Sequence, residues 1–528
     1  MPTDCVTYQK SGYFTKIITD YLDQKEDLQP FYNRFPTIEN FEAQIIEKQA
    51  NYNSTIRKVL VSELQNQYRQ LETSDLTKQN ITLLENTATF TVTTGHQLNL
   101  FTGPLYFIYK IVSTINLAKV LKAKYPSYHF VPIYWMATED HDFEEINYFN
   151  FRGKKICWNT ESTGPVGRLA TQGLDKVMEV INLELGAGTH AEFLKTLFKE
   201  AYLNHHNLAD ATRYLANALF QDQGLVILDA DNAALKREFI PYLKQELLQQ
   251  KAVKEVTETI AKLKNYTIQV NPRNLNLFYI EDHLRERIVL EDGIYKVNNT
   301  LLQFTESEII AALENHPEKF SPNVIMRPLY QEVVLPNLCY IGGGGEIAYW
   351  LELKAYFDSI KVSFPILLVR NSVLLVTEKQ NKKAAHLNLG WDDLFLKQED
   401  LLNQQTEKHS EFPIDFSTQK ETLNSQFRNL YEIAEKTDPS FLGAVRAQEI
   451  KQLKGLANLE KRLLKAQKRK YKEELERIKT LQNELFPNQS LQERKNNFSE
   501  MYLENNKLIG ECLNKLNPLS PHFEIITL

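Results

Sequence analysis

The residues best suited to chemistry form an acidic run that contains a histidine. Residues 139–145 read EDHDFEE, which places five carboxylates and His141 within seven positions. Carboxylates this close repel one another unless they are exposed, paired with cations or bound to a ligand. In a pocket they can bind a substrate amine, hold Mg²⁺ or act as a general base, and histidine titrates near neutral pH. We predict catalytic roles for Asp140, His141 and Asp142 and a substrate contact for Asn147.

The alternative for this run is an exposed acidic loop that also caps the next helix. The spacing differs from the H-E-x-x-H of a zinc site, and we predict no protein ligands for a metal.

A second candidate is the loop that joins a predicted strand to a predicted helix after residue 95. Unpaired N–H groups and the partial positive charge of a helix start suit a phosphate or a carboxylate. An ordinary turn, in which the glycines serve backbone geometry, is the alternative. We predict a catalytic role for His96. The substrate contacts predicted beside it are Gly95, Gln97, Thr102 and Gly103.

A third candidate combines an arginine with a run of four glycines at residues 342–345. Glycines between a strand and a helix let a ligand approach the backbone closely. The spacing fits neither a dinucleotide fingerprint nor a P-loop. Arginine pairs well with carboxylate or phosphate, whereas the tyrosines of this region can equally be core or pocket-wall residues. The predicted substrate contacts are Arg327, Gln331, Tyr340, Gly342, Gly343, Glu346 and Tyr349.

A fourth candidate follows the apolar segment FPILLV. Arg370 and Ser372 stand at its end, and we predict that they contact the phosphates of a cofactor. A buried structural arginine is the alternative. Cys339 lies inside an apolar run and is predicted to be a core residue rather than a nucleophile.

Strands must position all four candidates, because each follows an apolar or β-branched segment. These segments alternate with helical patterns, which predicts an α/β fold with parallel strands and right-handed crossovers. Ligands of such sheets bind at the carboxyl ends of the strands. The predicted core strands lie within 88–95, 129–137, 224–231, 338–341 and 364–370, and shorter strands at 276–280 and 287–290 belong to an insertion.

The sequence changes character after residue 375, where glycine becomes scarce. Leucines at helical spacing continue from about residue 440 to 486, which predicts one helix roughly 65–70 Å long at about 1.5 Å per residue. We predict an antiparallel coiled coil with helices in 376–435, whose seam also supplies a dimer interface. Its basic charge can contact nucleic acid, but an exposed coiled-coil face is the better interpretation.

The predicted domains follow from these changes. They are an N-terminal helical segment (1–85), a core (86–375) with insertions at about 150–220 and 250–320, a coiled-coil domain (376–490) and a segment that returns to the core (491–528).

Composition limits the functional classes. The 528 residues are 43% hydrophobic and carry a net charge of −6, which is not the footprint of a nucleic-acid binder. The four cysteines have no C-x-x-C spacing. Neither a secretory pattern nor a membrane-spanning run is evident, and we predict a cytoplasmic protein without membrane contacts.

Three long motifs together resemble a known family. The strings TGHQLNLFTGPLYFIYKIVSTINLAK, PIYWMATEDHDFEEIN and RPLYQEVVLPNLCYIGGGGEIAYW, followed by the coiled coil, are similar to the bacillithiol biosynthesis cysteine-adding enzymes. The resemblance implies a Rossmann-like core similar to class I nucleotidyltransferases, inserted connecting-peptide regions and a dimerising coiled coil. It also implies a pocket lined by the residues around Gly95 to Gln97, Asp140 to Asp142 and Gly342 to Glu346.

The same resemblance implies attachment of L-cysteine to the amine of glucosaminyl-malate, the last step of bacillithiol synthesis. Because an amide does not form from a free carboxylate in water without activation, we expect ATP with Mg²⁺ as the cofactor. Two other functions stay open: a nucleotidyltransferase acting on another small substrate, and a non-catalytic nucleotide-binding scaffold with a coiled coil.

Overall fold

The computed structural model describes residues 4–528, which form two compact units. The larger unit contains the residues up to Gln9, Tyr13–Leu375 and Leu491–Leu528. The smaller unit contains Lys10–Gly12 and Val376–Ser490. Among residues 4–528, no helix is both long enough and apolar enough to cross a membrane.

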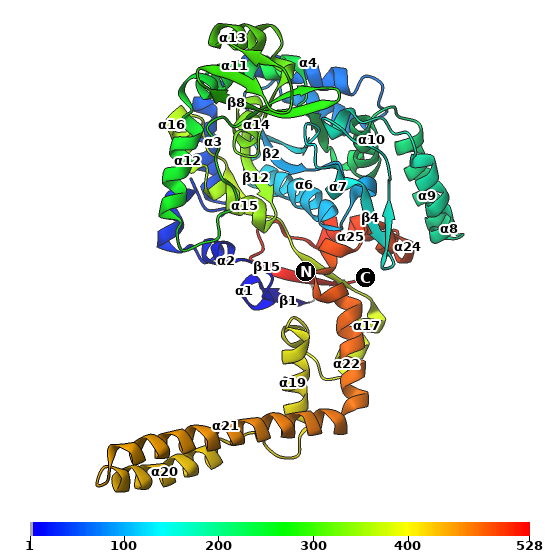
Figure 1. Ribbon diagram of the computed structural model, residues 1–528. Coiled ribbons are helices and arrows are strands. Elements are labelled where there is room, and N and C mark those ends of the chain that lie inside the picture. The colour runs from blue at the N-terminus through cyan, green and yellow to red at the C-terminus, as the bar shows by residue number, and fades with distance from the viewer. Residues whose placement is uncertain (1–3) are drawn as a thin grey trace. The chain divides into compact units, whose positions relative to one another are not determined.

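A five-stranded parallel sheet forms the centre of the larger unit (Figure 1). Its strand order is β13-β12-β2-β3-β6, and every neighbouring pair is parallel. Helices cover these strands, which explains why β3 is apolar without alternation. The predicted α/β class with a Rossmann-like parallel sheet is confirmed. The strands are β2 (Thr89–His96), β3 (His129–Met136), β6 (Val226–Asp229), β12 (Asn337–Gly342) and β13 (Ile366–Val369).

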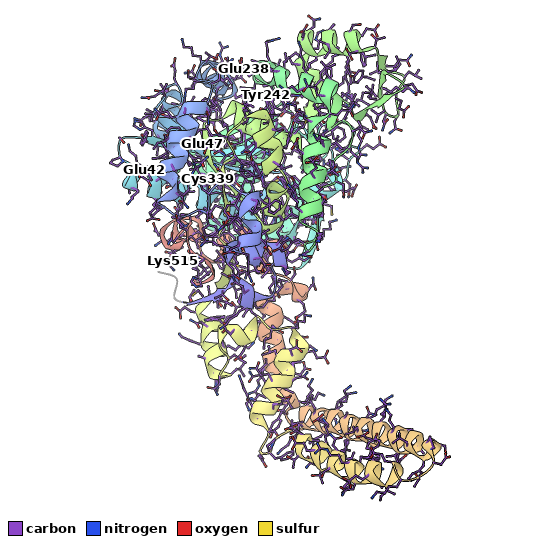
Figure 2. All side chains as sticks on the ribbon, turned by 90° about the vertical axis from the view of Figure 1, so that its left-hand side faces the viewer. Glu42, Glu47, Glu238, Tyr242, Cys339 and Lys515 are labelled. Carbon is purple, nitrogen blue, oxygen red and sulfur yellow. The ribbon has the colours of Figure 1, made fainter. Side chains whose placement is uncertain are left out.

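Helix α6 (Tyr106–Lys124) connects β2 to β3 and packs on both strands. Helices α14 (Met326–Val334) and α15 (Gly344–Leu351) flank β12 along the chain. Cys339 on β12, labelled in Figure 2, is fully buried, and burial raises its pKa well above the usual thiol value. It is a core residue, as predicted.

The N-terminal segment contains helices, as predicted, and also a strand that was not predicted. Strand β1 (Asp4–Thr7) pairs antiparallel with β15 (His522–Thr527), which also borders β14 (Val373–Val376). The main N-terminal helices are α1 (Tyr8–Ser11), α2 (Lys16–Leu22), α3 (Asn40–Asn51), α4 (Ile56–Gln67) and α5 (Asp75–Leu83).

Two segments are inserted between strands of the main sheet. The first separates β3 from β6 and contains α7 (Phe143–Ile146), β4 (Tyr148–Phe151), β5 (Lys154–Cys157), α8 (Leu174–Leu185), α9 (Thr189–Leu203) and α10 (Leu208–Phe220). The second follows α11 (Ala233–Gln249) and α12 (Lys251–Lys262) and forms an antiparallel sheet of order β10-β9-β8-β7-β11. Its elements are β7 (Leu277–Glu281), β8 (Leu284–Glu291), β9 (Ile294–Val297), β10 (Gln303–Phe304), α13 (Glu306–Asn315) and β11 (Phe320–Pro322).

The chain closes the larger unit with α16 (Lys354–Ile360) and the C-terminal helices. Helix α25 (Leu508–Lys515) packs on α6, so the end of the sequence contacts the core. The short helices before it are α23 (Gln492–Lys495) and α24 (Phe498–Glu504).

The smaller unit is helical and contains a long hairpin of α20 (Ser417–Ala434) and α21 (Pro439–Lys470). The prediction of a single helix from about residue 440 to 486 is wrong in one respect. Helix α21 ends before Tyr471, and a separate helix, α22 (Lys472–Leu485), follows it. Helix α19 (Gln398–His409) contacts both α21 and α22, which replaces one uniform seam by two packing surfaces. The remaining helices are α17 (Glu378–His386) and α18 (Trp391–Leu394).

Candidate functional site

Three of the four sequence motifs meet at one edge of the main sheet. Because β2, β3 and β12 run parallel, the residues that follow His96, Met136 and Gly342 emerge on the same side. This is the edge at which open α/β sheets bind ligands. Side-chain contacts join the motifs there.

A buried ion pair ties the glycine-rich loop to helix α6. The Lys110 Nζ atom lies 2.6 Å from Oε2 of Glu346 and donates to the Gly95 carbonyl at 2.7 Å. The Tyr340 hydroxyl donates to Oε1 of Glu346 at 2.7 Å, and the Gly343 N–H donates to Oε2 at 2.8 Å. Burial by itself raises the pKa of Glu346, but the charge and hydrogen bond of Lys110 outweigh that effect and hold it below its usual value. Glu346 therefore stays ionised and fixes the loop.

Arg327 lies beside this pair with its charge directed at neutral partners. Its guanidinium donates to Oε1 of Gln331 and to the Tyr349 hydroxyl, both at 3.1 Å. A Cβ atom on Gly95 would lie 3.2 Å from the Tyr340 hydroxyl and 3.7 Å from Arg327. Glycine at position 95 thus permits the close approach of β2 to both side chains. A half-buried guanidinium bonded to neutral groups is suited to an anionic ligand.

His96 is buried and neutral. The residue is 8% exposed, and its Nε2 atom has no hydrogen-bond partner among the described residues. Burial, reinforced by the charges of Lys110 and Arg370, lowers the pKa of His96 well below its usual value. Its ring contacts those of Tyr106 and Phe107, with centroids 5.4 and 5.2 Å away. Its Nε2 atom is closed off from solvent and its neutral ring carries no charge for an anion, so His96 lies behind the ligand-binding surface in this structure.

Side chains of the acidic run contact Gln97 and Arg285. Gln97 donates to Asp140 at 3.0 Å and to Glu145 at 2.9 Å. The Nδ1 atom of His141 lies 2.6 Å from the guanidinium of Arg285, which β8 contributes from the second insertion. One potential ligand atom from each of residues 140 to 142 lies within 4.8 Å of the others. The adjacent guanidinium repels a divalent cation, so these residues do not fit Mg²⁺ in this arrangement.

A buried network of ion pairs holds Glu139, the first residue of the acidic run, in place. Lys236, which is 1% exposed, lies 2.6 Å from Glu139 and 3.1 Å from Asp231. Arg168 completes the network with a second contact to Asp231 at 2.7 Å. Burial raises the pKa of Glu139, an effect that Lys236 opposes. These charges hold the ends of β3 and β6 in place, and next to them Asp142 is exposed whereas Asp140 is half-buried.

Comparison with known proteins decides the family. Residues 1–371 match the family description "Bacillithiol biosynthesis BshC, N-terminal Rossmann-like domain", and residues 373–528 match "Bacillithiol biosynthesis BshC, C-terminal coiled-coil domain". The chain belongs to the BshC family. The family that the three sequence motifs indicated is confirmed.

Relatives named "Putative cysteine ligase BshC" cover almost the whole chain. The relative from Flavobacterium johnsoniae is 65% identical over 100% of both chains. The relative from Cytophaga hutchinsonii is 38% identical over 97% of this chain and 96% of its own, and that from Bacillus cereus is 28% identical over 90% and 91%.

The loop before α6 is a strained turn in this BshC family member. Phe101, Thr102 and Gly103 all have positive φ, at 48°, 68° and 63°. That conformation is unusual for the β-branched Thr102, which is 2% exposed. Asn497 stabilises the turn by donating to the carbonyls of Phe101 and Gly103 at 2.7 and 2.6 Å. The predicted contacts Thr102 and Gly103 thus form the support of the site.

Other predicted residues also lie behind the surface. Gln331 and Tyr340 are 0% and 1% exposed and hold Arg327 and Glu346 in place. Asn147 is 7% exposed and its backbone carbonyl accepts from Trp158 at 2.7 Å.

The predicted phosphate contacts at the end of β13 form a buried ion pair. Arg370, 3% exposed, donates twice to Glu493 of α23, at 3.0 and 2.7 Å. Ser372 donates to the same carboxylate at 3.3 Å. This arrangement matches the structural alternative, because the guanidinium charge is already neutralised.

Sequence reasoning missed Lys110, Lys236 and Arg285. Lys110 carried a usable signal, since it is the only charged residue of α6 between Tyr106 and Ala118. Lys236 and Arg285 lie on exposed-looking segments, and only the fold brings them to the acidic run.

Proposed function

We propose that this chain is a cysteine ligase that joins L-cysteine to the amine of glucosaminyl-malate in the last step of bacillithiol biosynthesis. The observation that carries the proposal is the separation of charge at one sheet edge. Arg327, bonded to neutral groups, lies on the side of the glycine-rich loop, whereas Asp140 and Asp142 lie on the side of β3. Amide formation requires both a site for an anionic group and a site for an amine.

The Arg327 side binds the anionic group, and the side of the acidic run binds the amine and removes its proton. Arg327 binds a carboxylate or phosphate oxygen, and the glycines after β12 let that group approach the backbone. The attacking amine must lose its proton, and a carboxylate of the acidic run acts as the base, because Nδ1 of His141 already accepts from Arg285.

ATP, when bound, supplies the activation that converts the cysteine carboxylate into an acyl donor. The cationic side of the site, which contains Arg327, fits its phosphates. The acidic run does not fit Mg²⁺ while Arg285 contacts His141.

The relatives' name for the activity and the family's place in bacillithiol biosynthesis support this proposal over the two alternative functions. Its test compares Asp142→Asn with the matched control Glu144→Gln, an exposed carboxylate of the same run. We expect Asp142→Asn to lose ligation at least about 100-fold, the scale of a general base, and Glu144→Gln to retain it. Equal activity in both variants would remove Asp142 from the mechanism.

The smaller unit is proposed to form the dimer interface. Its hairpin exposes several large apolar side chains, which a second copy of the chain would cover. In light scattering, Ile450→Glu should shift the protein to monomer, and Lys451→Glu should not. The exposed residues are Leu430 (40%), Ile433 (54%), Phe441 (45%), Leu442 (40%), Ile450 (59%) and Leu459 (52%).

A further inference from the structure

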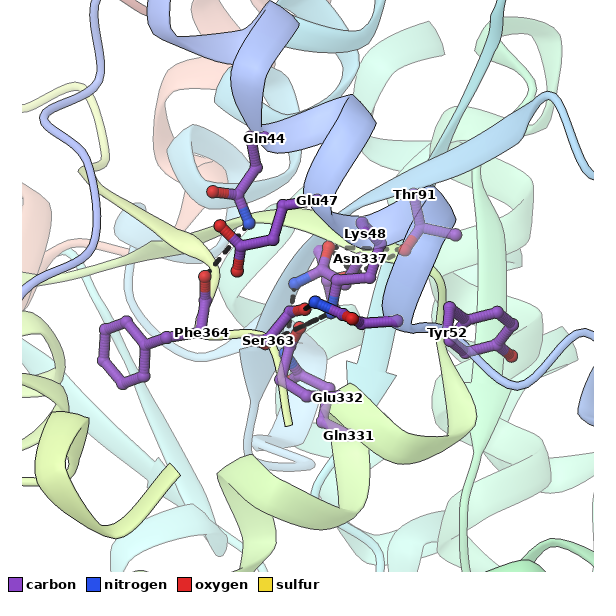
Figure 3. Close-up of polar contacts among 12 residues, drawn as sticks. Gln44, Glu47, Lys48, Tyr52, Thr91, Gln331, Glu332, Asn337, Ser363 and Phe364 are labelled. Carbon is purple, nitrogen blue, oxygen red and sulfur yellow. Dashed lines mark hydrogen bonds and ion pairs between the residues drawn. The ribbon is translucent and has the colours of Figure 1, made fainter. Parts of the chain in front are cut away.

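Another buried ion pair, between Lys48 and Glu332, adjoins Gln331 in the interior of the larger unit (Figure 3). The side chains of Lys48 on α3 and Glu332 on α14 are 2% and 0% exposed, and their Nζ and Oε2 atoms are 2.9 Å apart. Lys48 also donates to the Ser363 carbonyl at 3.3 Å, and Asn337 donates to Oε1 of Glu332 at 2.7 Å. Every polar group of this cluster is therefore bonded in the interior, where a misplaced partner is costly.

The pair controls which way the Gln331 amide points. Nε2 of Gln331 donates to Oε1 of Glu332 at 3.0 Å, and the amide oxygen consequently faces Arg327 at 3.1 Å. An ionised carboxylate can only accept, so it selects the NH₂ end of the amide. Gln331 is completely buried, and no solvent competes for either end.

Arg327 receives its orientation from this amide. Its two donated hydrogen bonds, to Gln331 and to the Tyr349 hydroxyl, hold the planar guanidinium from both sides. Neither acceptor is charged, and the positive charge remains available next to Gly95. A continuous line of contacts thus runs from α3 to the edge of the sheet.

We propose that Lys48 and Glu332 are positioning residues that act through Gln331 to hold Arg327 ready for the anionic group of a substrate. This inference rests on the proposed function, because it assigns Arg327 to a carboxylate or phosphate of one of the ligase substrates. It adds a residue of α3, some fifty positions before the first sequence motif, to the determinants of substrate binding.

The test uses Gln331→Met and Glu332→Gln. We call the contacts from Lys48 through Glu332 and Gln331 to Arg327 the relay. Gln331→Met breaks the relay but leaves the ion pair of Lys48 and Glu332 intact, so we expect this variant to fold. The matched control is Gln44→Met, another 0% exposed glutamine of the same region, which donates to the Phe364 carbonyl instead (Figure 3).

Two readouts are measured on the full chain. The first is the KM for L-cysteine, glucosaminyl-malate and ATP, each varied separately. We expect the KM of the single substrate held by Arg327 to rise about tenfold in both relay variants, with kcat reduced less, and no change in Gln44→Met. A rise for the malate compound, the amino acid or the nucleotide would identify whether Arg327 binds a carboxylate or a phosphate.

The second readout needs no ligase activity. Phenylglyoxal modifies free guanidinium groups, and mass spectrometry measures the rate of labelling at Arg327. The relay variants should label at least about three times faster than wild type and Gln44→Met. Unchanged labelling in Gln331→Met, or a loss of kcat without any KM change, would overturn the proposal. A wild-type chain that never ligates would refute the proposed function instead, while the labelling result would still decide the relay.

Discussion

The pair of Lys110 and Glu346 offers the sharpest test of how the site is held together. Lys110→Met keeps the length of the side chain but removes the charge that neutralises Glu346 and the donor to the Gly95 carbonyl. Breaking a buried ion pair by removing one partner costs about 3–5 kcal/mol, because the other charge stays buried and unpaired. The Glu346 side chain retains 26% exposure, against 5% for Lys110, so we expect the lower end, about 3 kcal/mol.

A double-mutant cycle with Glu346→Gln isolates the interaction. The double variant removes both charges and should be more stable than the sum of the single effects predicts, by about 1–3 kcal/mol. Urea unfolding followed by tryptophan fluorescence measures each free energy. Lys78→Met, which removes an exposed pair with Asp75, is the control and should cost about 0.5 kcal/mol or less. Additive effects of Lys110→Met and Glu346→Gln would show that the two side chains do not stabilise each other.

Three further predictions concern the surroundings of this pair. Because burial lowers the pKa of His96, the unfolded chain takes up a proton below about pH 6.5 that the folded chain does not, and the protein loses stability as the pH falls. In thermal unfolding, His96→Gln should reduce that loss by up to about 1.4 kcal/mol per pH unit. Asn497→Ala leaves the carbonyls of Phe101 and Gly103 without this donor, and calorimetry should show a destabilisation of about 1–3 kcal/mol, whereas no change would contradict the role given to this amide. Gly342→Ala places a Cβ atom 2.9 Å from Cβ of Glu346, which should displace the carboxylate and abolish most ligation while circular dichroism stays native; full activity would argue against the fixed loop.

The main sheet was predictable because its signals are local. β3 reads as an uninterrupted apolar run and β2 as a β-branched one, and both were located to within a few residues. The rule that ligands bind at the carboxyl ends of parallel strands then placed residues 95 to 97, 140 to 142 and 342 to 346 at a common edge.

What the sequence could not predict depends on partners far away along the chain. Arg370 reads as a strand-end phosphate contact until Glu493, 123 positions later, is seen to neutralise it. Arg285 reaches His141 only because the second insertion folds back over the acidic run. Strand β1 is four residues long, too short for a period to be recognised, and its pairing with β15 joins the two ends of the chain.

The proposed ligation can be tested directly by following the carboxylate oxygen of cysteine. Purified chain, Mg-ATP, glucosaminyl-malate and L-cysteine labelled with heavy oxygen in its carboxylate would be mixed, and the products analysed by mass spectrometry, with ATP omitted in parallel. We expect bacillithiol only when ATP is present, with a single labelled oxygen transferred to phosphate or AMP. Product that forms equally without ATP, or no product from a folded chain under either condition, would contradict it.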